Sequence, residues 1–473
     1  MDLGGGALFC TAAYLTAWLQ TAKLPVVFAH SESVATDKAV QRALATQYNA
    51  ETLTDRVWTT DVMNTMRLAR WQDAPLSNPN LTLWKIEQVL KGVPSLFKTY
   101  WPSIFWLRSL QLVPFMINGI LTKKKARRSA EWAYEDAVLE DGETVKIAYA
   151  GSSGDVPTPS EEPCVVLIMN HGAGGRESDL PGQQYVGRAI AKGWKVIALV
   201  RRGHIGKLTR PKFNFFGNTD ETRFLLDTYV KKRFPNSTLL FMGISAGSGL
   251  VARYMGEQGI LLKKAHASNV NTEAQYSDFK SQIPGYVSGA IGVAPGYNIE
   301  TCMGRFQEPF QSILLWAQKK LYLSKNKALL LEAFPEDYER LMAATNIQEW
   351  NDNTYRFAGF SSKDDYYDNM NPMRVAHHAV DPCLFINAKD DPICLMENVY
   401  EHLNIFEEPC CVAVVETATG THCPFAPLSW NPFTSQAWTE DVMEQFFDGV
   451  LALDDKGRGG GRGGHGQVDD KLK

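Results

Sequence analysis

The amino-acid sequence predicts an α/β fold with a mostly parallel central sheet flanked by helices. Apolar runs of strand length recur from residue 164 onward, and most end in small or polar residues. A segment with helical spacing, Asp220–Phe234, separates two of them. Strands that are apolar throughout are typical of a parallel sheet covered on both faces, where ligands bind at the carboxyl ends of the strands. The five runs are CVVLIMN, WKVIALV, STLLFMGIS, PCLFINAK and CVAVVETAT.

Composition places the chain among globular proteins and limits the kinds of partner that are expected. Of 473 residues, 45% are hydrophobic and 21% are charged, which is close to the globular average. The net charge of -4 gives no reason to expect nucleic acid as a partner, so a small or apolar partner is favoured. The eight cysteines include no C-x-x-C pair and no His spacing of the zinc type, so no zinc site is expected. No other metal or cofactor is expected either, because the chemistry predicted below needs none. Reduced thiols in a cytosol-facing domain are favoured, although sequons at Asn80 and Asn236 leave a lumenal location open.

The N-terminal region, residues 1–30, is predicted to be a membrane anchor. Leu3–Leu19 carries no charge, and apolar residues resume after Lys23 through Ala29. This length is marginal for a spanning helix of about 20 residues, and a secretory signal would normally begin with basic residues rather than Asp2. A cleaved signal peptide and a soluble helix are the alternatives.

Residues 31–128 are predicted to form a helical, membrane-proximal region. Trp101–Leu121 is apolar but is interrupted by polar residues and Pro114, so it does not predict a clean membrane span. The basic cluster Lys123–Arg128 follows it. This cluster is compatible with an anionic bilayer surface and equally with a solvated charge run beside a buried helix.

Residues 129–450 are predicted to form the main domain. Trp132–Gly151 has the pattern of a hairpin with a turn at residues 140–143. Between about residues 266 and 380 the strand–helix alternation is lost and aromatic and acidic residues accumulate, which indicates an inserted helical cap. Asp455–Lys473 is rich in Gly and is predicted to be a disordered tail rather than an RNA-binding RGG segment.

A candidate nucleophile lies in the segment FMGISAGSGL. Gly243-Ile244-Ser245-Ala246-Gly247 fits the G-x-S-x-G pattern of a nucleophile elbow, a sharp strand-to-helix turn that exposes a serine hydroxyl. The pentapeptide alone is weak evidence in a Gly-rich chain. Its setting strengthens it, because a buried strand precedes Ser245 and a segment with helical spacing follows it.

The candidate acid and base follow later strands in the expected order. Acyl transfer by serine needs a base that takes its proton and a carboxylate that orients the base. Asp390 and Asp391 end the strand LFINA, and Asp391 is preferred because it directly precedes Pro392, where the chain turns outward. His422 follows the next strand and is the predicted base. Ser245, Asp391 and His422 are therefore the predicted catalytic residues.

The loop NHGAGGRES, which follows the first central strand, is the predicted oxyanion site. We expect the backbone N–H groups of Ala173 and Ala246 to bind the oxyanion. A phosphate-binding loop is the rival interpretation, but no G-K-[ST] follows this loop and the loop itself does not read G-x-G-x-x-G.

These motifs resemble those of the YheT-like, or abhydrolase-domain, branch of the α/β-hydrolases. The similar blocks are YWPSIFWLRSLQ, LVRRGHIGKLTRPKFNFFGNTDE, GISAGSG, GFSSKDDYYDNMNP and INAKDDP. The branch includes membrane-bound esterases, acylglycerol lipases and phospholipases. The resemblance implies the α/β-hydrolase fold, Ser245, Asp391 and His422 as the triad, and a single N-terminal membrane anchor. The chain departs from the family where the oxyanion loop, usually P-G-L-T-G-G, reads HGAGG and where N-G-H is absent before Leu110.

The sequence therefore predicts a serine carboxylic-ester hydrolase that acts on acyl lipids at a membrane. Trp101–Leu121 and the aromatic cap are expected to form an apolar entrance. Transfer of the acyl group to an alcohol and an inactive membrane scaffold of the same fold are the alternatives. The sequence leaves open the acyl chain, the head group and the membrane concerned.

Overall fold

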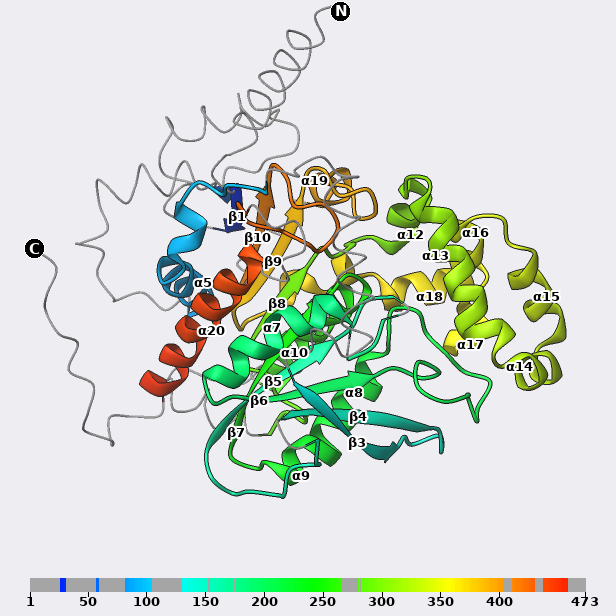
Figure 1. Cartoon of the computed structure of the whole chain (residues 1–473), viewed down its shortest axis with the longest axis horizontal. Helices are drawn as coiled ribbons and strands as arrows, with labels where there is room; N and C mark the ends of the chain where they lie inside the picture. Colours follow the sequence, from blue (N-terminus) through cyan, green and yellow to red (C-terminus); the bar gives the residue numbers. More distant parts are fainter. Residues whose placement is uncertain are drawn as a thin grey trace, which may run out of the picture.

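In the described part of the chain, ten strands form one twisted sheet (Figure 1). The computed structural model describes residues 26–30, 57–58, 81–103, 130–151, 154–173, 175–177, 179–265, 280, 282–402, 411–429 and 437–457. The strand order is β2-β1-β10-β9-β8-β7-β5-β6-β4-β3. The strands are β1 (Val26–His30), β2 (Val57–Trp58), β3 (Glu131–Val138), β4 (Thr144–Gly151), β5 (Cys164–Asn170), β6 (Lys195–Val200), β7 (Ser237–Ile244), β8 (Gly289–Val293), β9 (Cys383–Ala388) and β10 (Val412–Thr417).

The six central strands, β5 to β10, are parallel, and both edges of the sheet are antiparallel. β5 pairs with β6 and β7 in parallel, and β8, β9 and β10 continue the parallel pairing. The β3–β4 hairpin, which the sequence predicted, forms one edge, and β1 with β2 forms the other. This is the α/β-hydrolase fold, so the predicted mostly parallel sheet flanked by helices is confirmed, whereas the predicted N-terminal membrane-associated extension stays a prediction.

Helices cover both faces of the sheet because side chains alternate along each buried strand. On β7, Leu240 and Met242 pack on one face and Leu239 and Phe241 on the other. The first face is covered by α5 (Leu81–Lys91), α7 (Leu180–Ala191) and α20 (Trp438–Gly457). The second is covered by α8 (Thr219–Leu225), η2 (Leu226–Val230), α10 (Ala246–Ala265) and α19 (Glu397–Tyr400). Shorter turns lie at η1 (Pro94–Phe97), α9 (Lys231–Arg233), η5 (Pro372–Arg374) and η6 (Ala376–His378).

A helical cap follows β8 and lies at one end of the sheet (Figure 1). A third apolar cluster joins the cap helices to Phe213, Phe215 and Phe216 of the segment after β6. The cap is therefore packed against the carboxyl end of the sheet through a core of its own. Its helices are α12 (Ile299–Cys302), η3 (Met303–Arg305), α13 (Phe310–Gln318), η4 (Lys319–Ser324), α14 (Lys327–Ala333), α15 (Pro335–Ala343), α16 (Ile347–Asp352), α17 (Tyr355–Ala358) and α18 (Lys363–Met370).

The predicted cap boundaries were wrong at the N-terminal side. We expected the insertion to begin near residue 266, but β8 lies inside that range and pairs with β7 and β9. The cap begins after β8, at α12. At the other end of the domain, α20 continues to Gly457, three residues into the predicted tail. Residues 458–473 lie outside the described residues.

The predicted N-terminal boundaries also need correction. Val26–His30 form β1, which pairs antiparallel with β10, so these residues are not part of an anchor. Residues 1–25 lie outside the described residues. Residues 31–128 are not wholly helical, because Val57–Trp58 form β2, whereas α5 and η1 are helical as predicted. No helix in the described ranges combines the length and the apolar character needed to cross a membrane.

Candidate active site

Ser245 occupies a sharp turn between β7 and α10. Its φ of 54° is left-handed, and its backbone N–H donates to the carbonyl of Val293 at 2.8 Å. Two glycines permit the turn. A Cβ on Gly243 would lie 2.3 Å from the Gly247 carbonyl oxygen, and one on Gly247 would lie 2.4 Å from that of Asn170. Side chains at either position would push the elbow apart, so the local sequence fixes Ser245 above the sheet.

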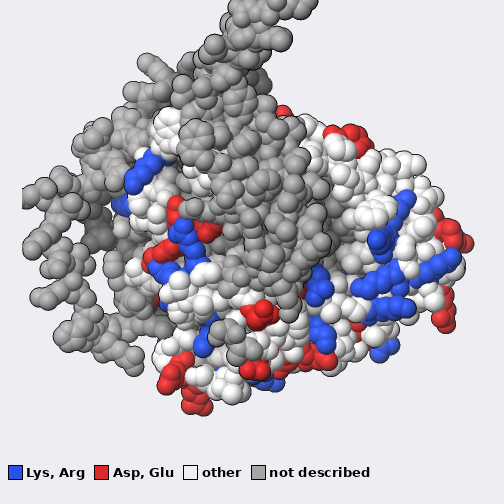
Figure 2. All heavy atoms as spheres, viewed as in Figure 1, with Lys and Arg blue, Asp and Glu red and all other residues white. Residues whose placement is uncertain are grey.

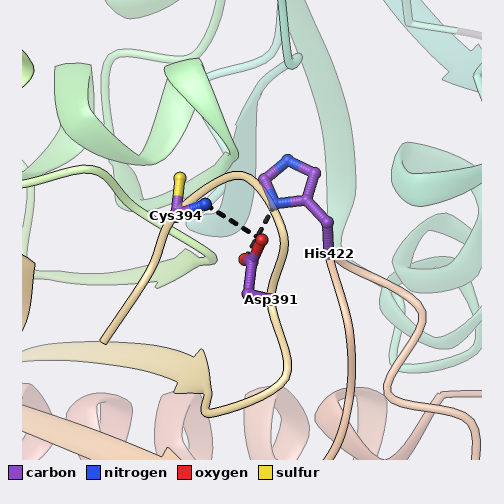
Figure 3. Close-up of side chains that lie close together, drawn as sticks. All are labelled: Asp391, Cys394 and His422. Atoms are coloured by element: carbon purple, nitrogen blue, oxygen red, sulfur yellow. Dashed lines mark hydrogen bonds and ion pairs between the residues drawn. The ribbon is translucent and has the colours of Figure 1, made fainter. Parts of the chain in front are cut away.

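Asp391 lies on the loop after β9 and is 1% exposed. The backbone N–H groups of Ile393 and Cys394 donate to its Oδ1 at 2.7 and 2.9 Å, which fixes the carboxylate. Figure 3 shows the bond from Cys394. The neighbouring Asp390, the less favoured candidate, accepts the backbone N–H of Thr421 at 2.7 Å. Asp390 therefore holds the loop that carries the histidine, and Asp391 faces the imidazole.

His422 connects the carboxylate to the serine. Its Nδ1–H donates to Asp391 Oδ2 at 2.9 Å, and the Ser245 hydroxyl donates to Nε2, also at 2.9 Å. Burial alone would lower the pKa of His422, but Asp391 and Cys423 outweigh it and raise the pKa well above its ordinary value. The three predicted residues thus lie in one hydrogen-bonded chain, in the geometry that a nucleophile, a base and an orienting acid require.

The loop that carries His422 has an unusual backbone. Thr421, Cys423 and Phe425 have φ values of 47°, 78° and 41°, a left-handed region that residues other than glycine seldom adopt. Such conformations cost about 1–3 kcal/mol each and persist only where the surroundings impose them. Here the Asp390 bond to Thr421 is one such restraint, and it helps to set the ring of His422 between serine and acid.

The same region holds a set of potential metal ligands. Asp391, Cys394 and His422 each place one ligand atom within 4.8 Å of the others (Figure 3). However, His422 Nδ1 and both carboxylate oxygens already make short hydrogen bonds with one another or with the backbone. A hydrogen bond with Cys302, together with burial, also raises the pKa of the Cys394 thiol well above its ordinary value. The donor set is therefore better matched to an acid–base pair than to a metal. The six cysteines in the described ranges are free thiols.

The predicted oxyanion loop lies against the nucleophile. A Cβ built on Gly172 would be 3.4 Å from Ser245 Cβ and 3.9 Å from its Oγ. Ala173 and Ala246, whose N–H groups we expect to bind the oxyanion, both line the cavity that contains Ser245. Neither N–H has a hydrogen-bond acceptor among the described residues. Both donors are therefore available to a reacting carbonyl oxygen.

Sequence reasoning missed the side chains that hold this loop. Arg201, the first residue after β6, donates from Nη2 to the Gly172 carbonyl at 2.6 Å and from its backbone N–H to His171 Nε2 at 3.3 Å. His204 contacts the far side of the loop at Gly175, and the cap residue Tyr322 contacts His204. The signal for Arg201 and His204 was their place directly after β6, beside the carboxyl end of β5. Nothing in the sequence indicated Tyr322.

A cavity of about 230 Å³ opens above Ser245 and His422. Its wall is mostly apolar and comes from the cap, the segment after β6 and the loop after β9 that carries Asp391. Its apolar side chains include Phe215, Phe216, Met303, Phe306, Leu314 and Ile393. The cap thus contributes to an apolar entrance as expected. Trp101 does not line this cavity, and residues 104–121 of the predicted entrance lie outside the described residues.

Comparison with known proteins gives distant relatives that include a lipase and a phospholipase. Human monoacylglycerol lipase ABHD2 is 26% identical over 328 residues, which cover 64% of this chain and 69% of the relative. Mouse phospholipase ABHD3 is 21% identical over 370 residues, covering 76% of this chain and 80% of the relative. The chain is thus similar in sequence to abhydrolase-domain proteins. The family resemblance predicted from the sequence blocks is therefore confirmed.

Two further proteins are similar to this chain. Human protein ABHD15 is 25% identical over 293 residues, which cover 60% of this chain and 55% of that abhydrolase-domain protein. Among solved structures, an esterase of Pyrococcus furiosus, Pf2001, is similar with a TM-score of 0.39 and 12% identity, covering 68% of this chain and 91% of the esterase. No protein-family model matches the chain.

Proposed function

We propose that this protein is a serine carboxylic-ester hydrolase that acts on acyl lipids, with Ser245, Asp391 and His422 as its catalytic residues. The observation that carries the proposal is the hydrogen-bonded chain from Ser245 through His422 to Asp391 at the base of an apolar cavity. Two relatives, named as a monoacylglycerol lipase and a phospholipase, support the same class of reaction.

In the proposed mechanism, His422 Nε2 takes the proton of Ser245 while Oγ attacks the ester carbonyl. Asp391 keeps the Nδ1 proton in place and stabilises the imidazolium. The developing oxyanion accepts the N–H groups of Ala173 and Ala246, which are held by the sheet and the elbow before the substrate arrives. The imidazolium then protonates the leaving alcohol, and water activated by His422 releases the fatty acid from the acyl-enzyme.

The apolar cavity wall favours an acyl chain over a polar ester group. Phe215, Phe216, Met303, Phe306 and Leu314 present carbon surface toward Ser245. Burying a chain there gains about 0.8 kcal/mol for each CH₂ removed from water. Esters with longer chains should therefore bind more tightly than acetate esters until the cavity is filled.

The lipid class is tested by hydrolysis assays on a panel of substrates. We expect the full chain to hydrolyse monoacylglycerols or phospholipids with a higher kcat/KM than short water-soluble esters. Ser245→Ala, measured beside it, sets the background. Equal background hydrolysis by both proteins would refute the proposal, and a preference for acetate esters would refute only the lipid class. If, in the presence of an added alcohol, new esters formed faster than free fatty acid, acyl transfer would be indicated instead.

Membrane contact is part of the proposal, and the cap offers a surface for it. Ile313 and Trp316 are 51% and 63% exposed and lie on one face of α13, whose Leu314 lines the cavity. Lys320 continues this face and lies 4.9 Å from the Trp316 ring. The segment Lys319–Lys327 carries four lysines and no acid. Figure 2 shows basic side chains gathered on the cap side of the molecule, with acidic side chains at its outer edge, and the basic group suits contact with anionic lipid. The predicted N-terminal anchor remains a proposal for residues 1–25.

Replacing the exposed face of α13 should separate lipid from soluble substrates. Ile313→Ser combined with Trp316→Ala should lower hydrolysis of lipid in anionic vesicles by about tenfold, because two apolar anchors are lost. Hydrolysis of a soluble short ester should stay unchanged. Val138→Ser removes an equally exposed side chain, 50%, from the β3 edge of the sheet and serves as the control. An equal loss on both substrates, or the same loss in the control, would exclude α13 as a lipid contact.

A further inference from the structure

A chain of two hydrogen bonds links the cap to the oxyanion loop. The Tyr322 hydroxyl, on η4 of the cap, lies 2.8 Å from His204 Nε2. His204 Nδ1 lies 2.7 Å from the carbonyl oxygen of Gly175. All three residues are buried, with Tyr322 0% and His204 6% exposed. These bonds are therefore shielded from competition with water.

The direction of both bonds follows from the chemistry of the groups. A carbonyl oxygen only accepts, so His204 Nδ1 carries the proton that it donates to Gly175. Burial, followed by the positive charge of Arg201, lowers the pKa of His204 well below its ordinary value, so the ring is neutral and Nε2 accepts. Burial raises the pKa of Tyr322 to about 12, which keeps its hydroxyl protonated and donating. These two hydrogen bonds, called the relay below, thus run from Tyr322 through His204 to Gly175.

The cap end of the relay is firmly held. Tyr322 stacks on Phe213 with 4.3 Å between ring centroids and 12° between planes. Lys325 Nζ donates to the Gly203 carbonyl at 2.7 Å, and Asn326 Oδ1 accepts the Leu208 N–H at 2.9 Å. Three residues of one cap segment therefore bind the loop after β6 on both sides of His204.

The other end of the relay reaches the nucleophile. The Gly175 N–H donates to the Gly172 carbonyl at 3.1 Å, so these two residues form the ends of one tight turn. Gly172 lies against Ser245, and Ala173, the predicted oxyanion donor, is the next residue. Arg201 holds the Gly172 carbonyl from one side, and His204 holds the Gly175 carbonyl from the other. The orientation of the Ala173 N–H therefore depends on two side-chain clamps, of which only the His204 clamp extends into the cap.

We propose that Tyr322 and His204 are positioning residues that set the oxyanion loop, so that a correctly seated cap is needed for full transition-state stabilisation. The inference rests on the proposed function, because it concerns the oxyanion of the same acyl transfer. A donor displaced by a fraction of an ångström still lets substrate bind but stabilises the transition state less. The effect of breaking the relay should therefore fall on kcat and leave KM almost unchanged.

Tyr322→Phe removes only the hydroxyl of the relay and keeps the stacked ring. Using the full chain and a soluble ester, we expect kcat to fall about 10- to 100-fold, with KM within about twofold of the wild type. The inhibition constant of a trifluoromethyl ketone, which forms a tetrahedral adduct with serine, should rise by the same factor as kcat falls.

Tyr366→Phe is the matched control. Tyr366 is also a cap tyrosine with 0% exposure, and its hydroxyl donates to Asn351 Oδ1 at 3.0 Å, within the cap. Both variants lose one buried hydrogen bond and should show similar falls in Tm. If Tyr322→Phe matches Tyr366→Phe in kcat and in ketone affinity, the relay is only structural and the inference is wrong. If the wild type itself does no better than Ser245→Ala, the proposed function fails instead.

A double-mutant cycle tests whether Tyr322 acts through His204. The shorter amide of His204→Asn can still donate to Gly175 but does not reach Tyr322. Adding Tyr322→Phe to that variant should lower kcat by less than about twofold, since the link is already broken. If adding Tyr322→Phe lowered kcat by a further 10- to 100-fold, Tyr322 would not act through His204, and the proposed relay would be wrong.

Discussion

Ser245→Ala is expected to lower kcat for ester hydrolysis by about 10⁶-fold, because the variant has no group that can form the acyl-enzyme. His422→Ala should be about as severe, since an unassisted serine hydroxyl is a weak nucleophile near neutral pH. The double variant should be no worse than either single one, because the two residues act as a unit. Measurements of kcat on the best ester of the panel, with Tm as a check on folding, test all three.

A different pattern would contradict this mechanism. If the loss in the double variant were the product of the two single losses, Ser245 and His422 would act in separate steps. If His422→Ala kept more than about a tenth of the activity, His422 would not be the base, since general-base catalysis is worth about 10²–10⁴-fold or more.

Asp391→Asn is expected to lower kcat by about 10⁴-fold while leaving the fold intact. The Ile393 and Cys394 N–H groups need an acceptor, so the amide oxygen of the asparagine would occupy the Oδ1 position. Its NH₂ group would then face His422 Nδ1 and force that nitrogen to accept. The proton would move to Nε2, which could no longer take the proton of Ser245.

Asp390→Asn is the matched control for the acid. The amide oxygen of an asparagine can also accept the Thr421 N–H, so kcat should stay within about tenfold of the wild type. The pH profile adds a second readout. Because Asp391 raises the pKa of His422, the acid limb of kcat/KM should lie above the usual range of histidine and move to lower pH in Asp391→Asn. A larger loss in Asp390→Asn than in Asp391→Asn would reverse the assignment of the acid.

Most of the fold could be predicted because parallel strands leave a strong apolar signal, but β8 could not. Its sequence, GAIGV, is short and includes two glycines, so it lacks the continuous run of large apolar residues seen in the other central strands. Packing explains the glycines, since a Cβ on Gly292 would lie 2.6 Å from Phe385 and one on Gly289 would lie 2.8 Å from Val450. The residues of β8 are small because large side chains from neighbouring elements pack against them. The local sequence pattern does not indicate those neighbours. The edge strands β1 and β2 were missed for a related reason, since they are defined by pairing rather than by composition.

The predicted site residues lie together because topology constrains them. Carboxyl ends of parallel strands meet at one edge of a sheet, so residues that follow β7, β9 and β10 are brought together whatever their separation in sequence. The relay from Tyr322 has no such constraint. Tyr322 and His204 are 118 residues apart and belong to different layers of the molecule. Their contact depends on how the cap folds on the sheet, which the sequence pattern did not indicate.

The most direct test of the central claim is the identity of the nucleophile. The full chain is treated with a fluorophosphonate probe, digested, and the modified peptide located by mass spectrometry. We predict one adduct, on Ser245, that is lost in Ser245→Ala and forms far more slowly in His422→Ala. An adduct on another serine, or no adduct in folded wild-type protein, would contradict the assignment of this site to acyl transfer.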